Sequence, residues 1–297
     1  MRKRISIFGC GDVGLRIARR LCESGIDPKG LVPVVRSLES RQKLLPEFSE
    51  VMSLDLDAIQ LDDKHDEINS ILRNVSELYY LVPPQKSGTI DHRTKRLLTL
   101  LAAQGVCLRR IVLISTTGVY GDHQGDFVTE DTPINPSTPR SQRRANMEQQ
   151  WLAFAEKQQC ILSILRVPGI YSFSRLPRKR LEAQAPIVDP QQCGFTNRIH
   201  ADDLAMVCEI VMNNQTKTDI YNVTDGTPGK MSQYFIDVAN FLDIPIPKIL
   251  SFAEAEAVVT NEMMSYLRES RKISNNKLLE TFNLKLNYKD YREGMRF

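Results

Sequence analysis

The sequence predicts an α/β protein: a doubly wound parallel sheet of the Rossmann type with a smaller C-terminal substrate domain. Short apolar runs alternate with amphipathic stretches through the first half of the chain, as in parallel sheets covered by helices on both faces. A glycine-rich string separates the first apolar run from the first amphipathic stretch. The alternation stops after the first half, which indicates a region built differently.

The first half supplies the expected sheet. Strands are expected at 4–8, 31–35, 78–82, 110–115 and 161–167, and helices near 12–24, 38–46, 65–74, 90–104 and 139–158. Each strand is apolar along its length because right-handed crossovers bury both faces of a parallel sheet. Pro33 has no N–H for a strand ladder, so we place it at the first residue of its strand or at a bulge.

The second half loses the alternation. Segment 171–195 is rich in Arg, Pro and Gln, and helices are expected at 231–242, 252–270 and 275–281, before a short polar tail. We therefore expect two domains. The dinucleotide-binding domain would comprise 1–170 and 195–225, and a small substrate-binding domain would comprise 171–194 and 226–297.

Charge and cysteine usage exclude several classes of protein. A formal net charge of +3 is too small for a nucleic-acid footprint, and the six cysteines form no C-x-x-C pair. The start MRKR runs directly into the apolar ISIF, which leaves no room for a signal peptide, and no apolar run approaches a membrane span of about 18 residues. We expect a cytoplasmic protein with a small-molecule substrate, no nucleic-acid or membrane partner and no metal site.

The string FGCGDVG at 8–14 is the strongest motif. Gly9, Gly11 and Gly14 have the G-x-G-x-x-G spacing, and Asp12 and Val13 begin the helix that follows. In a dinucleotide site the first glycine permits a tight turn, the second lets the backbone approach the pyrophosphate, and the third lets helix pack on sheet. The alternative is a merely glycine-rich turn, but the strand-turn-helix context at the start of a βα series favours dinucleotide binding.

The end of the second strand bears on which dinucleotide binds. An NAD site usually has Asp or Glu there, but this chain has Arg36 and Ser37, with Arg41 one helical turn further on. A guanidinium can grip a 2′-phosphate bidentately, so we favour NADP(H), with NAD(H) as the alternative. Arg36 could instead simply face solvent.

The helix expected at 139–158 begins with reversed charges. Thr138 and Pro139 fit the N-cap and first helical position, yet Arg140, Arg143 and Arg144 follow. Exposed cations there oppose the helix macrodipole at a cost of about 0.3–1 kcal/mol each. We therefore expect these arginines to be compensated by an anionic cofactor or substrate, or by Asp126 and Glu130.

With the strand string RIVLISTTGVYGD at 110–122, the sequence resembles the extended short-chain dehydrogenase/reductase family, the NAD-dependent epimerase/dehydratase group. The strings LRVPGIY (165–171), RIHADDLA (198–205), YNVTDG (221–226) and SRKISNNKL (270–278) follow in the family's usual order. The resemblance covers nearly the whole chain. It implies hydride exchange between a nicotinamide and a carbinol carbon, commonly on a nucleotide-linked sugar.

The resemblance also implies roles for individual residues. The Ser or Thr that brackets the reacting oxygen falls on Thr116, with Ser115 and Thr117 as neighbours. The implied cofactor contacts are Asp55 and Leu56 for adenine, Leu81, Val82 and Pro83 for the cofactor edge, and Ser115, Pro168 and Gly169 near the nicotinamide. The helices at 90–104 and 139–158 are those through which relatives often dimerise, which leaves a homodimer open.

Two departures from the family pattern affect mechanism. Extended members usually show G-x-x-G-x-x-G, whereas position 8 is Phe, as in atypical members. Relatives also begin the later helix with Tyr-x-x-x-Lys-x-x-x-Glu, and anchoring on Glu148 puts Arg140 in the Tyr place and Arg144 in the Lys place. Arginine stays protonated and cannot act as acid or base, a loss that typically costs 10²–10⁴ in rate.

The predicted catalytic set is therefore Thr116, Arg140 and Arg144. Arg144 could still donate to the ribose hydroxyls, and Arg140 could bind an anionic group. Tyr120 and Tyr171 are candidates for the substrate site, although both could be packing residues. Arg178 lies in a cation-rich segment at 175–180 where relatives place a substrate lid, which favours an anionic or nucleotide-linked substrate.

Two functions remain open from the sequence. The first is an NAD(P)-dependent oxidoreductase or epimerase-like enzyme with atypical or reduced chemistry, acting on a carbonyl or sugar substrate. The second is a non-catalytic NADP(H)-binding sensor. The glycine loop and the second-half strings favour the enzyme, whereas the loss of Tyr and Lys favours the sensor.

Overall fold

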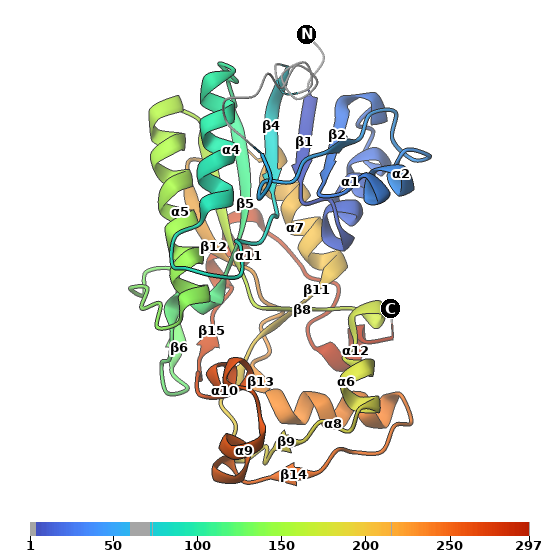
Figure 1. Cartoon of the computed structure of the whole chain (residues 1–297), viewed down its shortest axis with the longest axis vertical. Coiled ribbons are helices and arrows are strands. Elements are labelled where there is room, and N and C mark those ends of the chain that lie inside the picture. Colours follow the sequence, from blue (N-terminus) through green and yellow to red (C-terminus); the bar gives the residue numbers. More distant parts are fainter. Residues whose placement is uncertain (1–3, 60–71, 73, 215, 297) are drawn as a thin grey trace. The chain divides into compact units, whose positions relative to one another are not determined.

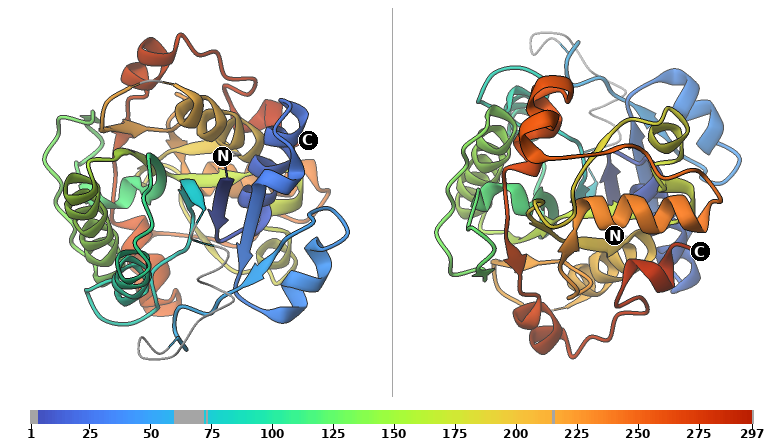
Figure 2. Two further views of the ribbon diagram at one scale, coloured as in Figure 1. Left: turned by 90° about the horizontal axis from the view of Figure 1, so that it is seen from above. Right: turned by 90° about the horizontal axis from the view of Figure 1, so that it is seen from below.

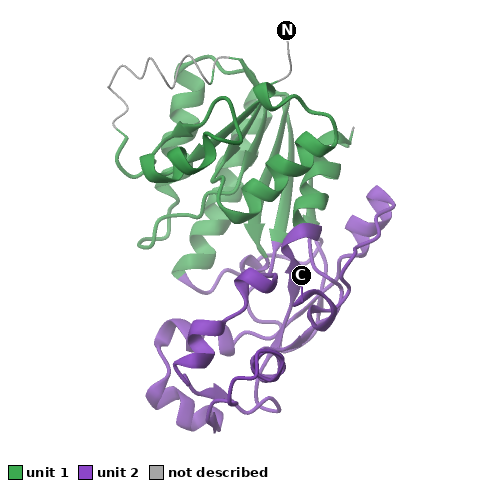
Figure 3. Ribbon diagram, turned by 90° about the vertical axis from the view of Figure 1, so that its right-hand side faces the viewer, with its two compact units in different colours: residues 1–116, 139–166, 204–221 green, residues 117–138, 167–203, 222–297 purple. Residues whose placement is uncertain are grey.

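The computed structural model describes residues 4–59, 72, 74–214 and 216–296. By internal contacts these divide into two compact units, coloured separately in Figure 3. Unit 1 comprises 1–116, 139–166 and 204–221, and unit 2 comprises 117–138, 167–203 and 222–297. The assignment of a dinucleotide-binding and a substrate domain stays a prediction, and the helix expected near 65–74 falls almost wholly outside the described residues.

A seven-stranded sheet in the order β12-β7-β5-β4-β1-β2-β3 forms the centre of unit 1. Its strands are β1 (Arg4–Phe8), β2 (Leu31–Val35), β3 (Met52–Ser53), β4 (Val75–Tyr80), β5 (Arg110–Thr116), β7 (Ile161–Val167) and β12 (Asp219–Asn222). Neighbouring strands from β5 to β3 pair in parallel. The sheet, with helices on its faces, confirms the predicted Rossmann-type α/β fold.

Helices cover both faces of this sheet (Figures 1 and 2). They are α1 (Asp12–Glu23), α2 (Leu38–Leu44), α4 (His92–Ala103), α5 (Pro139–Gln158) and α7 (Ala201–Asn213), with a short 3-10 turn at Pro28–Gly30. Helices α4 and α5 pack side by side on one face, where Leu97, Trp151 and Phe154 join Phe8 and Leu113 in one buried core. On the other face α1 and α7 are joined by an ion pair between Arg20 and Glu209, 2.9 Å apart.

The expected position of Pro33 is wrong. Pro33 is the middle residue of β2 and pairs with Ile7 of β1 in an unbroken register. Strand β3 pairs with β2 only at Val34 and Val35. Beside Pro33, β2 therefore has no β3 partner that would receive a hydrogen bond, and the missing N–H is tolerated there.

Some element bounds were also placed incorrectly. The strand expected at 78–82 runs from Val75 to Tyr80, and Leu81 only donates its N–H to the Phe8 carbonyl at 2.8 Å. Helix α4 starts at His92 rather than 90 because the Asp91 carboxylate accepts from the backbone N–H groups of Arg93 and Thr94. An aspartate N-cap of this kind fixes the first turn of a helix.

Unit 2 consists of short strand pairs and short helices. The pairs are β11 (Arg198–His200) with β8 (Gly169–Tyr171), β14 (Ile249–Leu250) with β9 (Ile187–Val188), β15 (Lys272–Ile273) with β6 (Phe127–Val128), and β10 (Phe195–Thr196) with β13 (Gly229–Lys230). The helices are α6 (Arg178–Glu182), α8 (Met231–Phe241), α9 (Phe252–Val258), α10 (Asn261–Leu267), α11 (Asn276–Phe282) and α12 (Tyr291–Gly294), with 3-10 turns at Thr117–Tyr120 and Phe173–Arg175.

The single helix expected at 252–270 is two helices. Helix α9 ends at Val258, Val259 is extended, and the Thr260 hydroxyl caps α10 by accepting from the Met263 N–H at 3.3 Å. Two β-branched valines before a threonine cap explain the break. Among the described residues, no helix is long and apolar enough to cross a bilayer.

Candidate cofactor and substrate sites

The turn after β1 has the geometry expected of the first glycine. Gly9 has φ +82°, and a Cβ built on it would lie 3.0 Å from both Leu81 C and Val82 N. The N–H groups of Gly9 and Cys10 both donate to the Val34 carbonyl at 3.0 Å. Only glycine combines the left-handed conformation with this close approach of the β1 and β4 backbones.

Gly11 and Gly14 differ in how much space surrounds them. A Cβ on Gly14 would lie 3.0 Å from the Gly9 carbonyl oxygen, so this position must be small for α1 to pack against the turn. A Cβ on Gly11 would meet nothing within 4 Å. Gly11 is the N-cap of α1 and supplies no side-chain cap, so open space lies at the end of the helix where N–H groups and the dipole attract anions.

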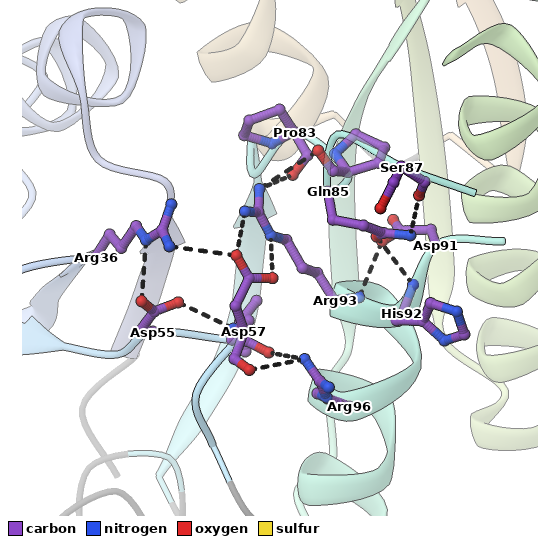
Figure 4. A network of polar contacts seen from close by, with 12 residues as sticks. Arg36, Asp55, Asp57, Pro83, Gln85, Ser87, Asp91, His92, Arg93 and Arg96 are labelled. Carbon is purple, nitrogen blue, oxygen red and sulfur yellow. Dashed lines mark hydrogen bonds and ion pairs between the residues drawn. The ribbon is translucent and has the colours of Figure 1, made fainter. Parts of the chain in front are cut away.

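Arg36, the residue directly after β2, is held by two carboxylates (Figure 4). Its Nε lies 3.0 Å from Asp55 Oδ2, and its Nη2 lies 3.3 Å from Asp57 Oδ2. The arginine side chain is still 65% exposed. Arg36 therefore does not simply face solvent, and Asp55, predicted as an adenine contact, is its partner.

The segments after β3 and β4 are joined by two arginines of α4. Arg93 binds both carboxylate oxygens of Asp57 and donates to the Pro83 carbonyl at 2.8 Å. Its hydrogen bonds hold the pKa of the Asp57 carboxyl below its usual value. Arg96 donates to the Leu56 carbonyl at 2.8 Å. The predicted adenine segment and cofactor-edge segment thus form one connected surface of unit 1.

The other residues near the end of β2 have structural roles. The Ser37 hydroxyl caps α2 by accepting from the Ser40 N–H at 3.2 Å. Arg41 does not lie free for a phosphate, because its Nε donates to the Val51 carbonyl at 2.8 Å.

Two of the three arginines at the start of α5 donate to backbone carbonyls. Arg143 is buried and donates to the Gly88 carbonyl, in the loop before α4. Arg144 Nη1 donates to the Ile114 carbonyl of β5 at 3.2 Å. Arg140 is half-buried in the first turn. Since carbonyl oxygens carry partial negative charge, they offset the unfavourable helix dipole without any carboxylate in that turn.

The end of β5 is tied to α5 and β7 by a buried polar group. Ser115 donates to Glu148 Oε1 at 2.5 Å, and Glu148 Oε2 lies 2.8 Å from Arg166 Nη2. All three side chains are buried. The Ser115 hydroxyl is therefore occupied by Glu148, whereas Thr116, the last residue of β5, is half-buried.

In unit 2, the predicted substrate residues fall in different surroundings. Tyr120 is fully buried and donates to Asn222 Oδ1 at 2.8 Å, and Arg178 is exposed at the start of α6. Tyr171 ends β8 and lines a pocket of about 300 Å³. Pro168 precedes β8, and Gly169, its first residue, lines the same pocket.

We call this cavity the Arg198 pocket. Its lining includes Tyr171, Arg175, Arg198, Tyr234, Met263 and Tyr266. The Arg198 guanidinium lies 4.0 Å from the Tyr234 ring centroid and 5.2 Å from that of Tyr291. Arg198 is only 7% exposed, and burial lowers the pKa of its guanidinium from the ordinary value.

Comparison with known proteins finds a family model that matches part of the chain. The NAD dependent epimerase/dehydratase family model matches residues 86–224. This segment is similar to that family. The matched residues include β5 with Thr116, the start of α5 and β7, and the resemblance seen in the sequence is confirmed.

Several known proteins are similar to this chain over most of its length. Protein YeeZ of Escherichia coli K12 is 22% identical over 252 residues, 83% of this chain and 86% of its own length. A conserved protein of unknown function from Silicibacter pomeroyi has a similar structure, with 26% identity, a TM-score of 0.79 and coverage of 99% and 96% of the two chains. The Bacillus cereus UDP-glucuronic acid 4-epimerase in complex with NAD has 15% identity, a TM-score of 0.75 and coverage of 98% and 96%, which supports the fold.

The sequence reasoning missed the residues that build most of the Arg198 pocket. Arg198 stands inside the string RIHADDLA, which was used only as a family motif. The strand reads Arg-Ile-His, so its local sequence gives no signal that Arg198 is buried. Nothing in the local sequence indicates that Tyr234 and Tyr266 converge on it, because they come from separate helices.

Proposed function

We propose that this protein binds NADP(H) at the β1–α1 turn and acts as an oxidoreductase or epimerase-like enzyme on a carbonyl or nucleotide-linked sugar substrate. The observation that carries the proposal is the glycine turn. Gly9 and Gly14 allow the close backbone approaches, while the space beyond Gly11 is open at an uncapped helix N-terminus. Such a cradle fits a pyrophosphate.

The residues that would hold the cofactor lie along the ends of the unit 1 strands. The N–H groups at the start of α1, including those of Asp12 and Val13, would bind the pyrophosphate. The surface joined by Arg93 and Arg96 would hold the adenosine, with Leu81 and Val82 at its edge. A nicotinamide held there would supply hydride exchange to the substrate.

NADP(H) is preferred because a cation, rather than a carboxylate, ends β2. Arg36 is exposed and paired with Asp55 and Asp57, and a phosphate dianion could replace these carboxylates as its partner. The same two carboxylates could instead serve a ribose hydroxyl, which keeps NAD(H) as the alternative. NAD is also the nucleotide bound in the Bacillus cereus 4-epimerase structure.

Chemistry in this site must proceed without the usual tyrosine. Arg140 cannot give or take a proton at ordinary pH, so Thr116 would polarise the reacting oxygen and the proton would come from solvent or another group. We therefore expect slow or atypical turnover. A general acid usually contributes 10²–10⁴ in rate.

Two assays test this proposal on the full chain. Dissociation constants for NADPH and NADH are measured by fluorescence titration, and NADPH oxidation is followed over a panel of aldehydes, ketones and nucleotide sugars. Tighter NADPH binding with turnover of at least one substrate supports the enzyme. NADPH binding with no turnover across the panel favours the sensor, and tighter NADH binding overturns the cofactor assignment.

A further inference from the structure

Arg198 is a buried cation without a conventional partner. Its guanidinium offers five N–H donors, yet it makes no hydrogen bond or ion pair with any described residue. Its contacts are the faces of Tyr234 and Tyr291. Such stacking holds the plane of the guanidinium and leaves the N–H groups at its edge available. A charged group at this burial is normally paired, so the edge of the guanidinium at the pocket is a candidate site for an anion.

A second polar group in the same pocket lacks a partner. Tyr171 is 1% exposed, and its hydroxyl makes no hydrogen bond to any described residue. Burial raises the pKa of Tyr171 well above its usual value, so the hydroxyl stays protonated and can donate. Two unsatisfied donor groups, one of them cationic, therefore belong to one cavity.

The nearest alternative is that Asp225 is the counter-ion of Arg198. The Asp225 carboxylate accepts from the Thr227 N–H at 3.0 Å, and its other oxygen is buried without a partner, so it is not bonded to the guanidinium. Burial raises the pKa of Asp225 to about 8, which keeps it largely uncharged at neutral pH. Asp225 therefore makes no hydrogen-bonded ion pair with Arg198.

The remaining lining is apolar or aromatic. Met231, Phe235, Met263 and Tyr266 contribute to the wall, and Arg175 adds an exposed second cation. The volume of about 300 Å³ is at the lower end for ligand pockets. The pocket thus suits a small molecule that joins an oxyanion to a flat apolar group.

We propose that the Arg198 pocket binds the anionic end of the substrate, an oxyanion carried on a ring, with the oxyanion on Arg198 and Tyr171 and the ring against Met263 and Tyr266. The assignment of this ligand as substrate rests on the proposed function. The binding itself does not, because every residue involved lies in unit 2.

Calorimetric titration of the full chain tests the proposal. The probes are phenyl phosphate and benzoate, which carry a phosphate and a carboxylate on the same kind of ring. Benzyl alcohol is the neutral analogue. At least one anion should bind, and benzyl alcohol should bind at least tenfold more weakly. A stronger response to phenyl phosphate assigns the anion as a phosphate, and a stronger response to benzoate assigns a carboxylate. If neither anion binds below about 10 mM, the proposal is overturned.

Variants locate the binding. Arg198→Met should weaken the better anion at least tenfold, and Tyr171→Phe and Tyr266→Ala severalfold each. Arg292→Met is the matched control, because Arg292 also lies over the Tyr291 ring, at 4.7 Å, but pairs with Asp237 at 2.9 Å. Equal affinity in Arg198→Met and wild type overturns the proposal. If Arg198→Met does not fold, the two tyrosine variants provide the test. Unchanged anion affinity in both of them overturns the proposal.

NADPH affinity is measured on the same samples. It should stay unchanged in every pocket variant. Failure of the wild type to bind NADPH would remove the proposed function while leaving the anion result standing, so the two failures are distinguishable.

Discussion

Glu148 of α5 and Arg166 of β7 form a buried ion pair, with Arg166 Nη2 2.8 Å from Glu148 Oε2 and side chains 4–5% exposed. The same carboxylate accepts from Ser115 at the end of β5. Helix α5 is thereby fixed to two neighbouring strands just one turn beyond Arg144. The pair sets the position of the helix that carries the predicted catalytic arginines.

Removing one member of this pair should be costly. Glu148→Ala removes the carboxylate that the buried Arg166 binds, and we expect a loss of about 3–5 kcal/mol in the free energy of unfolding. Glu156→Ala, on an exposed position of the same helix, should change it by less than about 0.5 kcal/mol. Urea unfolding measures both. A loss at Glu148 no larger than that at Glu156 would show that the ion pair does not hold α5.

Gly9 and Gly25 separate two costs of adding a side chain. Both have positive φ, +82° and +91°, but only Gly9 faces backbone atoms at 3.0 Å. Gly25→Ala should lose about 1 kcal/mol from the conformation alone. Gly9→Ala should lose at least about 1 kcal/mol more, because the β1 and β4 backbones must separate. Equal thermal denaturation midpoints for the two variants would refute the close approach.

Arg36 should decide cofactor preference. Arg36→Ala removes a charge-assisted contact worth about 1.5–3 kcal/mol, so NADPH should bind at least tenfold more weakly while NADH changes little. Arg19→Ala is the control, since Arg19 is also exposed and pairs with Glu47 at 2.8 Å. Fluorescence titration measures the NADPH and NADH affinities of wild type and both variants. Equal NADPH affinity of Arg36→Ala and wild type would contradict the NADP(H) assignment.

Asp225 should make stability depend on pH. Its folded pKa of about 8, raised chiefly by burial with Asp290 and Asp203 adding to it and Arg198 opposing it, lies above the unfolded value of 3.8. Between these values the folded state holds a proton that the unfolded state has lost, so stability falls as pH rises, by about 1.4 kcal/mol per pH unit. Asp225→Asn cannot ionise and keeps an acceptor for Thr227.

The comparison of wild type and Asp225→Asn isolates the contribution of Asp225 ionisation to stability. Urea unfolding at pH 5, 6, 7 and 8 should show the variant gaining on the wild type with each step. A difference between the two that is independent of pH would mean that Asp225 ionises normally in the folded protein.

The sequence was most informative about the sheet. Strands at 4–8, 31–35 and 161–167 and the helix at 139–158 were predicted with their observed bounds, because continuous apolar runs and helical periodicity carry their own signal. Pro33 and the break at Thr260 were mistaken because their outcome depends on which neighbours pair and cap. Local sequence does not determine such contacts.

The candidate site also has parts that local sequence predicts and parts that it does not. The glycine turn could be predicted because the local backbone geometry of such a turn requires residues without side chains. The carboxylate partners of Arg36 and the carbonyl partners of Arg143 and Arg144 come from other strands and loops, so only the structure reveals them. Arg198 needed both a buried strand and rings from separate helices to be recognised.

The central claim is that the open space beside Gly11 holds the cofactor pyrophosphate. Gly11 has negative φ, and a Cβ there meets no atom within 4 Å, so Gly11→Ala should fold with an unchanged thermal midpoint. The account predicts that NADPH binds the wild type with one-to-one stoichiometry and binds Gly11→Ala at least tenfold more weakly. Equal NADPH affinity for the two proteins, or no binding to the wild type, would contradict it.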